Sequence, residues 1–230
     1  MDRDDAKAAL ASFTALVGPG DASLPLDRVA LAMSAVLRPA VDVEKSLDLL
    51  DGLAASCPPG GRDSVVAHLF GAHRFAGDRS TYSDWRNSCL DHVLETGRGI
   101  PITLSLLLVE VARRCGVELV GIGMPAHFLV GDAHDPGWFV DPFHGGRAID
   151  RAGCEALLGE ITRDQVPWHP SHLDPTPNPA IVARMLNNLR AAFDQRRDRV
   201  RLALVMRMRM ALPQLHLERD EAVRALAVLN

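Results

Sequence analysis

His127 and Asp141 are the two residues whose type and spacing best suit acid–base chemistry. His127 lies in "PAHFLV", and Asp141 follows "GWFV" and begins "DPF", so both have apolar neighbours. If the two segments pair as strands, the carboxylate can fix the tautomer and orientation of the imidazole, as the base and orienting residues of a catalytic triad do. A buried histidine with satisfied hydrogen bonds and an aspartate that caps a turn would give the same pattern.

The stretch "RGIPITLSLLLVEVARRCG", residues 98–116, predicts a helix that begins at Pro101 and is apolar on nearly every side. Such a helix is expected to be the buried centre of a domain, and its N-terminus is a favourable place for a nucleophile. Pro101 has no group that can attack a carbonyl, and it lacks the N–H that could stabilise an oxyanion. The position resembles the start of an active site whose nucleophile is missing.

Other residues near this helix could replace the nucleophile or line a cleft. Ser105 lies on the same face as Pro101, one turn and about 6 Å further along the axis, although a small residue there also allows close packing. Cys89 precedes the helix and could equally be a small buried hydrophobe. Trp85 and Asn87 could line the mouth of the cleft, and Asn87 could instead cap a helix.

The sequence gives no metal signature. The loop "DAHDPG", residues 132–137, together with His144 offers carboxylates and imidazoles, but a solvated hairpin loop has the same composition and the spacing matches no known metal motif. The four cysteines are scattered and form no C-x-x-C pair, which excludes a zinc signature and a compact disulfide framework. We therefore expect no metal and no cofactor.

Strand character is confined to the middle of the chain. Residues 117–124, 126–132 and 137–143 are short segments rich in Val, Ile and Phe, separated by Gly or Pro, which is typical of an antiparallel meander. Helical periodicity dominates elsewhere, and "PWHPSHLDPTPNP" is a proline-rich connector. The chain is therefore expected to be α+β, with an N-terminal helical region (1–80), a core (81–165), and a connector with C-terminal helices (166–230).

Composition excludes two classes of partner. A net charge of −4 over 230 residues argues against charge-driven binding of nucleic acid. The longest mostly apolar stretch, residues 100–109, is far too short to span a bilayer, and the charged N-terminus has no signal-peptide pattern. A cytoplasmic protein with reduced thiols is the expectation, and the sequence does not indicate an oligomeric state.

"GIPITLSLLLVEVARRCGVELVGIGMPAHFLV" followed by "FVDPFHGG" resembles the SirB-one family, whose central domain belongs to the transglutaminase-like superfamily. "WRNSCLDHVLETGRGIPI", "ARMLNNLRAAF" and "LERDEAVRALAVL" extend the resemblance to about residues 80–225. Ala126 departs from the family, which usually has Gly before this histidine. The resemblance implies a papain-like core, in which a central buried helix packs on a small antiparallel sheet between N- and C-terminal helices.

The resemblance also implies roles for single residues. In catalytic members of the superfamily, a cysteine at the start of the central helix attacks an acyl group, a histidine is its base, and an aspartate orients the histidine. The histidine corresponds to His127 and the aspartate to Asp141, whereas the cysteine position falls at or beside Pro101. The SirB-one family tends to have the same Gly-x-Pro-Ile sequence at this position.

Two functions follow as hypotheses. In the first, the protein is a non-catalytic descendant that uses a cleft with His127 and Asp141 to bind a peptide, a small ligand or a protein partner. In the second, it is an enzyme of amide or acyl chemistry, with His127 as general base, Asp141 as its orienter, and water or the substrate's own amine as nucleophile. The proline at position 101 favours the first. A histidine in a working cleft is expected to be partly exposed and to face Pro101.

Overall fold

The computed structural model describes residues 3–18 and 24–213, and the chain forms two compact units. Each unit is assembled from separate stretches of sequence. The first, here called the helical unit, consists of Met1–Leu47, Ser83–Asp91 and Pro177–Asn230. The second, here called the sheet unit, consists of Asp48–Tyr82 and His92–Thr176. The predicted division into 1–80, 81–165 and 166–230 follows the order of segments along the chain and stays a prediction.

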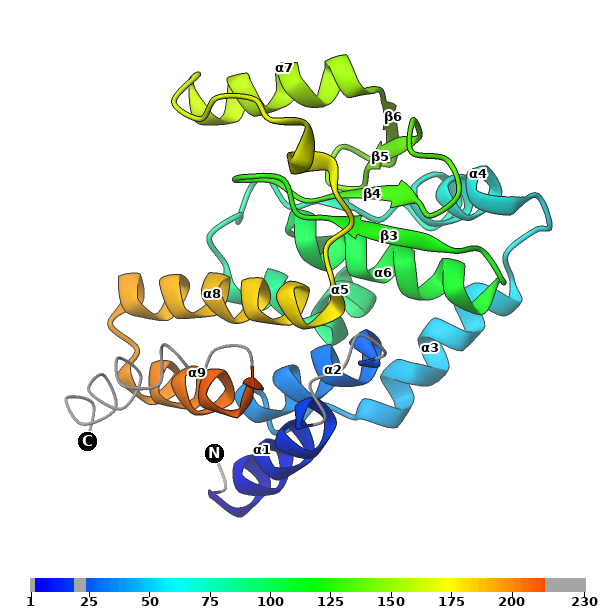
Figure 1. Cartoon of the computed structure of the whole chain (residues 1–230). Coiled ribbons are helices and arrows are strands. Elements are labelled where there is room, and N and C mark those ends of the chain that lie inside the picture. The colour runs from blue at the N-terminus through cyan, green and yellow to red at the C-terminus, as the bar shows by residue number, and fades with distance from the viewer. Residues whose placement is uncertain (1–2, 19–23, 214–230) are drawn as a thin grey trace. The chain divides into compact units, whose positions relative to one another are not determined.

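The helical unit is built from four long helices and one short 3-10 helix within its described residues (Figure 1). These are α1 (Arg3–Val17), α2 (Leu26–Leu37), η2 (Trp85–Ser88), α8 (Asn178–Arg196) and α9 (Arg199–Ala211). Helix α2 is buried on almost all sides, because α1, α8 and α9 all pack against it. The predicted helix over 217–229 lies outside the described residues. Asn178 is the first residue of α8, and its side-chain amide donates to Leu24 O at 2.9 Å.

Two helices begin in the helical unit and continue into the sheet unit, namely α3 (Val43–Ala55) and α5 (Leu90–Thr96). The other helices of the sheet unit are α4 (Gly61–Val66), the π-helix η1 (Ala67–Ala72), α6 (Pro101–Arg114), α7 (Arg151–Thr162) and the 3-10 helix η3 (Pro170–Leu173). The sequence analysis did not predict helix α7. No helix in the described ranges is long and apolar enough to cross a membrane.

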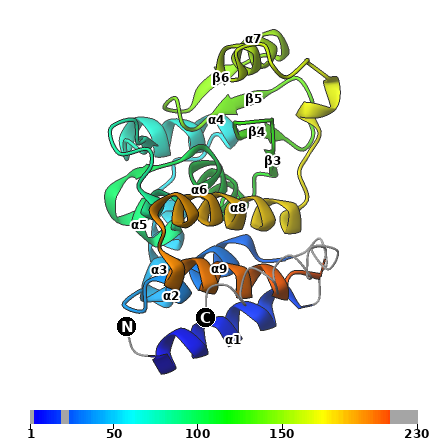
Figure 2. The ribbon, with the colours of Figure 1, turned by 90° about the vertical axis from the view of Figure 1, so that its left-hand side faces the viewer.

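The sheet unit contains a four-stranded antiparallel meander in the order β3-β4-β5-β6. Its strands are β3 (Leu119–Ile122), β4 (Leu129–Asp132), β5 (Phe139–Asp141) and β6 (Arg147–Ile149). The first three confirm the predicted strands, and β6 is additional. Figures 1 and 2 show α6 on one side of this sheet and α7 on the other. A core cluster joins Phe139 and Ile149 of the sheet to Leu157 and Leu158 of α7.

Helix α6 is the buried centre of this unit, as its sequence predicts. Pro101 occupies the first turn, and the preceding Ile100 is extended, so the missing proline N–H breaks no helical hydrogen bond. Glu110 is the acidic residue on the otherwise apolar helix, and it is 3% exposed. Its carboxylate binds Arg113 at 2.8 Å and Arg114 at 3.1 Å, so the buried charge is compensated on the same helix.

A short parallel pair, β1 (Ala76–Gly77) with β2 (Arg98–Gly99), lies outside the region where strands were expected. It corrects the prediction that strand character is confined to residues 117–143. Gly77 donates its backbone N–H to Phe143 O at 3.0 Å. A Cβ atom at Gly77 would lie 2.4 Å from the Phe143 ring, so this close approach requires glycine. The pair thereby holds the turn that follows β5.

Candidate functional site

His127 and Asp141 are hydrogen-bonded in the sheet unit. His127 Nε2 lies 3.1 Å from Asp141 Oδ2, as the sequence pattern predicted. Asp141 ends β5, and His127 lies in the turn that leads into β4, the neighbouring strand. This turn places Ala126 in the left-handed region at φ 59°, where glycine is normally favoured. Ala126 therefore adopts a backbone conformation that glycine reaches at lower cost.

The expectation that His127 is partly exposed is wrong. Its exposed fraction is 4%, and Asp141 is fully buried. The turn after β5 folds back over the pair, and the Phe143 ring packs edge-on against the His127 imidazole at 6.1 Å between ring centres. The Tyr82 ring packs in turn against Phe143 at 5.8 Å. An aromatic cover, rather than an open cleft, surrounds the imidazole of His127.

His144 is a third member of the site, and sequence reasoning did not connect it with Asp141. Its Nδ1 lies 2.6 Å from Asp141 Oδ2, the same oxygen that contacts His127. Its backbone N–H also donates to Asp141 Oδ1 at 3.2 Å. The signal was present in "DPFH", because an aspartate followed by proline favours a turn in which the side chain reaches residues two or three positions on. The His144 side chain is 27% exposed, so it is the solvent-facing imidazole of the site.

The acidic side chains of the loop 132–137 bind an arginine rather than His144. Arg62 binds Asp132 at 2.7 Å and Asp135 at 2.9 Å, so one guanidinium bridges both carboxylates. His134 pairs at the surface with Glu118 at 2.8 Å. His144 instead contacts Asp141.

The charge of the Asp141 carboxylate is stabilised where it is buried. Burial alone raises the pKa of Asp141, but the hydrogen bonds and the charges of His127 and His144 lower it by more. The net result is a pKa below the ordinary value for aspartate. Two imidazoles on one carboxylate oxygen thus keep a fully buried acid ionised.

The turn after β5 is fixed by its own backbone. Gly146 N donates to Asp141 O at 3.0 Å and Gly145 N donates to Pro142 O at 3.2 Å. Gly146 has φ 72°, and a Cβ there would lie 2.7 Å from the Phe70 ring, so the close packing on η1 requires glycine. Together with the bond from Gly77 to Phe143, these contacts set the position of His144.

The remaining predicted site residues divide between the two units. Ser105 lies on α6, fully buried, and its hydroxyl donates to Phe128 O at 3.4 Å, next to His127 in the chain. Trp85, Asn87 and Cys89 belong to the helical unit. Trp85 packs there on Phe193 at 5.1 Å, and Asn87 is buried within η2, whose cap is Asp84.

The two buried thiols, Cys89 and Cys154, have little nucleophilic character. Burial, with a contribution from the nearby Asp91 charge, raises the pKa of the Cys89 thiol to about 12. Burial and the charges of Asp150 and Asp141 raise the pKa of Cys154 to about 11. Because the thiolate is the reactive form, both groups are expected to be inert at neutral pH.

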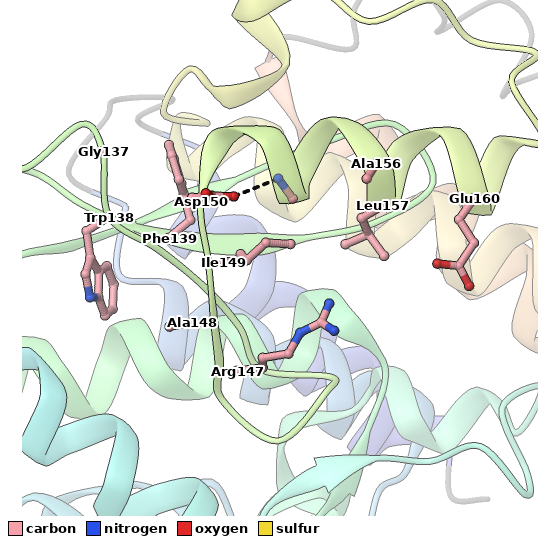
Figure 3. Close-up of a pocket in the computed structure, with 11 residues that line it drawn as sticks. Gly137, Trp138, Phe139, Arg147, Ala148, Ile149, Asp150, Ala156, Leu157 and Glu160 are labelled. Atoms are coloured by element: carbon pink, nitrogen blue, oxygen red, sulfur yellow. Dashed lines mark hydrogen bonds between the residues drawn. The ribbon is translucent and has the colours of Figure 1, made fainter.

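A pocket of about 710 Å³ lies between strands β5–β6 and helix α7 (Figure 3). Figure 3 shows Trp138 and Glu160 at opposite ends of the lining, with Arg147 between them. Arg147 is also the cross-strand partner of Asp141 in the β5–β6 ladder. The pocket therefore begins one strand away from the carboxylate that binds the two imidazoles.

A comparison with known protein families matches this chain to one family model. The family model described as the transglutaminase-like superfamily matches residues 61–187, which is more than half of the chain. That range contains α6, the four-stranded sheet and the three residues of the His–Asp–His site. No solved structure matches the chain. The narrower resemblance to the SirB-one family stays a prediction.

Similar proteins include bacterial and animal sequences. A UPF0162 protein of Xylella fastidiosa is 38% identical over 136 residues, covering 56% of this chain and 48% of the relative. A UPF0162 protein of Vibrio cholerae is 33% identical with the same coverage. The human F-box only protein 21 is 32% identical over 108 residues, covering 43% of this chain and 17% of that protein. The chain thus spans about half the length of the bacterial relatives.

Proposed function

Because the chain belongs to the transglutaminase-like superfamily, we propose that it retains the superfamily's site for binding a small ligand or a peptide, without a thiol nucleophile. The observation that carries this proposal is the His127–Asp141–His144 cluster, in which a fully buried carboxylate is kept charged by two imidazoles. Such an arrangement needs specific partners at three positions, and buried charges of this kind commonly mark functional sites.

Helix α6 supports the absence of thiol chemistry. Its first residue is Pro101, which has neither a nucleophilic group nor an N–H for an oxyanion. Cys89 lies in the helical unit, and the high pKa values of Cys89 and Cys154 argue against either as a substitute. The pocket beside Arg147 offers a ligand space and a cation next to the cluster.

One observation favours an enzyme as the second candidate. His144 binds Asp141 through Nδ1 and is partly exposed, which is the arrangement of a general base whose orientation an aspartate fixes. In that case the role of base passes from His127 to His144, and water or a substrate amine attacks the acyl group. Turnover of amide or ester substrates that is lost in His144→Ala would support this candidate.

The binding proposal is tested by screening dipeptides and small carboxylic acids against the full chain with ligand-observed NMR. We expect at least one compound whose signal changes persist in His134→Ala and disappear in His144→Ala. His134 is the matched control, because it also pairs with a carboxylate but lies outside the cluster. Binding that is unaffected by His144→Ala, or lost equally in both variants, would contradict the proposal.

A further inference from the structure

We infer that His127, Asp141 and His144 together bind a divalent transition-metal ion such as Zn²⁺. This inference rests on the proposed function, since it names a ligand for the same cluster. One potential ligand atom from each of the three residues lies within 4.8 Å of the other two. Within the described residues, this is the group of three or more His, Cys, Asp or Glu side chains that lie close enough together to hold a metal ion.

The distances within the cluster suit a metal centre. Each imidazole contacts the carboxylate, with His127 Nε2 at 3.1 Å and His144 Nδ1 at 2.6 Å from Asp141 Oδ2. Ligands at 2.0–2.1 Å from a tetrahedral zinc ion are separated from one another by about 3.3 Å. The third separation, between the two imidazole nitrogens, is within 4.8 Å, so binding an ion requires the imidazoles to approach each other by at most about 1.5 Å.

The donor set selects the class of metal. Two imidazole nitrogens and one carboxylate oxygen suit Zn²⁺, Co²⁺, Ni²⁺ or Fe²⁺, whereas Ca²⁺ and Mg²⁺ require more oxygen ligands than this cluster supplies. Three protein ligands also leave one tetrahedral position for water or for an organic ligand, as in catalytic zinc sites. The metal would replace the hydrogen atoms between the imidazoles and Oδ2, and each neutral imidazole would carry its proton on its other nitrogen.

The surroundings hold the ligands in place. The backbone N–H of His144 binds the second carboxylate oxygen, Oδ1, and so fixes the plane of the carboxylate. Phe143 packs against both imidazoles, at 6.1 Å from His127 and 5.3 Å from His144. A competing site in the loop 132–137 is disfavoured, because Arg62 already binds both of its aspartates.

The test is a titration of the chelator-treated full chain with Co²⁺, followed through the visible absorption bands of the bound ion and through competition by Zn²⁺. We expect one ion per chain. His144→Ala should weaken binding by about tenfold or more, since a ligand is lost, whereas His134→Ala should change it by less than about twofold. His144 is the preferred variant because its side chain is partly exposed and we expect the variant to fold, which circular dichroism will verify.

Two outcomes overturn the inference. Binding that survives His144→Ala and shows sulfur-to-cobalt charge-transfer bands would place the ion at the partly exposed thiols of Cys57 and Cys115. An absence of saturable binding by the wild type would exclude a metal centre altogether. If Co²⁺ does not bind but the organic ligands of the NMR screen still depend on His144, the metal inference fails and the proposed function stands. If neither binds, both fail.

Discussion

Asp141 is the residue on which the candidate site depends. It is fully buried, its Oδ2 contacts two imidazoles, and its Oδ1 accepts a backbone hydrogen bond. The two histidines differ in burial, since His127 is 4% exposed whereas the side chain of His144 is 27% exposed. We therefore expect His127 to contribute more to stability than His144, and His144 to be the imidazole that a ligand in solution can reach.

We expect His127→Ala to lower the free energy of unfolding by about 1–3 kcal/mol, because it removes a buried partner from a buried carboxylate. His144→Ala should cost less than about 1 kcal/mol, since water can reach the vacated position. Urea denaturation followed by circular dichroism measures both values. A larger loss in His144→Ala than in His127→Ala would contradict the expectation that the more buried imidazole contributes more to stability.

The lowered pKa of Asp141 predicts a pH dependence of stability. A carboxyl group whose pKa is lower in the folded state stabilises the protein above its unfolded pKa, about 3.9 for aspartate. That contribution is lost as the pH falls through the folded pKa. We expect the difference in unfolding free energy between the wild type and Asp141→Asn to be constant above about pH 5 and to shrink at lower pH. A difference that grows on acidification would contradict this sign.

At this scale the sequence predicted one contact and missed another. The hydrogen bond between His127 and Asp141 follows from two neighbouring strands, so local pattern was sufficient to find it. The burial of His127 depends on the turn after β5, which a bond from Gly77 to Phe143 holds in place. A contact between residues so far apart in the chain leaves no periodic signal, and the exposure of His127 was therefore predicted wrongly.

Helices and strands were predicted correctly from the sequence where their apolar residues recur with strong periodicity. Helix α6 and strands β3, β4 and β5 lie where the pattern placed them, because apolar residues recur there at helical or strand spacing. Strand β6 has three residues, and two of them, Arg147 and Ala148, are exposed, so no alternation was visible. Strands β1 and β2 have two residues each and exist through their pairing with one another.

The start of α6 allows a direct test of what remains of the superfamily's site. Pro101→Cys places a thiol in the first turn of a helix, where the partial positive charge of the helix dipole lowers its pKa. We expect this thiol to react with iodoacetamide faster than Cys89 and Cys154, whose pKa values are raised to about 12 and about 11. Mass spectrometry of tryptic peptides gives the rate at each cysteine.

The His127 imidazole supplies the control for that experiment. If the start of α6 and the His127 imidazole retain the superfamily's geometry, adding His127→Ala to Pro101→Cys should slow alkylation at position 101 and leave alkylation of Cys57 and Cys115 unchanged. An introduced thiol as slow as Cys89, or one indifferent to His127→Ala, would mean that the helix start and the imidazole no longer form one site.

On the scale of the whole molecule, the notable property is the discontinuity of both units. The helical unit unites the N-terminal helices, residues 83–91 and the C-terminal helices. Composition and linkers reveal only boundaries that are continuous in sequence, which is why reading the chain in order did not yield these units. Tertiary contacts hold the pieces together, including Asn178 with Leu24 and the Arg196 guanidinium with Ser83 O at 2.7 Å.

The ion pair between Arg38 and Asp91 is the contact whose removal should report on the helical unit alone. Asp91 is 4% exposed, so Arg38→Ala leaves a buried carboxylate without its cation, and we expect a loss of about 2–3 kcal/mol. Arg28→Ala is the matched control, because Arg28 and Glu44 are exposed and 3.7 Å apart, and its cost should stay below about 1 kcal/mol.

Trp85 makes this loss measurable within one unit, since Trp138 and Trp168 belong to the sheet unit and can be replaced by phenylalanine. In that background, Arg38→Ala should shift the urea midpoint of Trp85 fluorescence downward, whereas Arg28→Ala should barely move it. Adding Asp91→Asn to Arg38→Ala should recover part of the loss, because a neutral amide costs less to bury than an unpaired carboxylate. Equal shifts for the two arginine variants, or no recovery with Asp91→Asn, would mean that the Arg38–Asp91 pair does not hold residues 83–91 to the N-terminal helices.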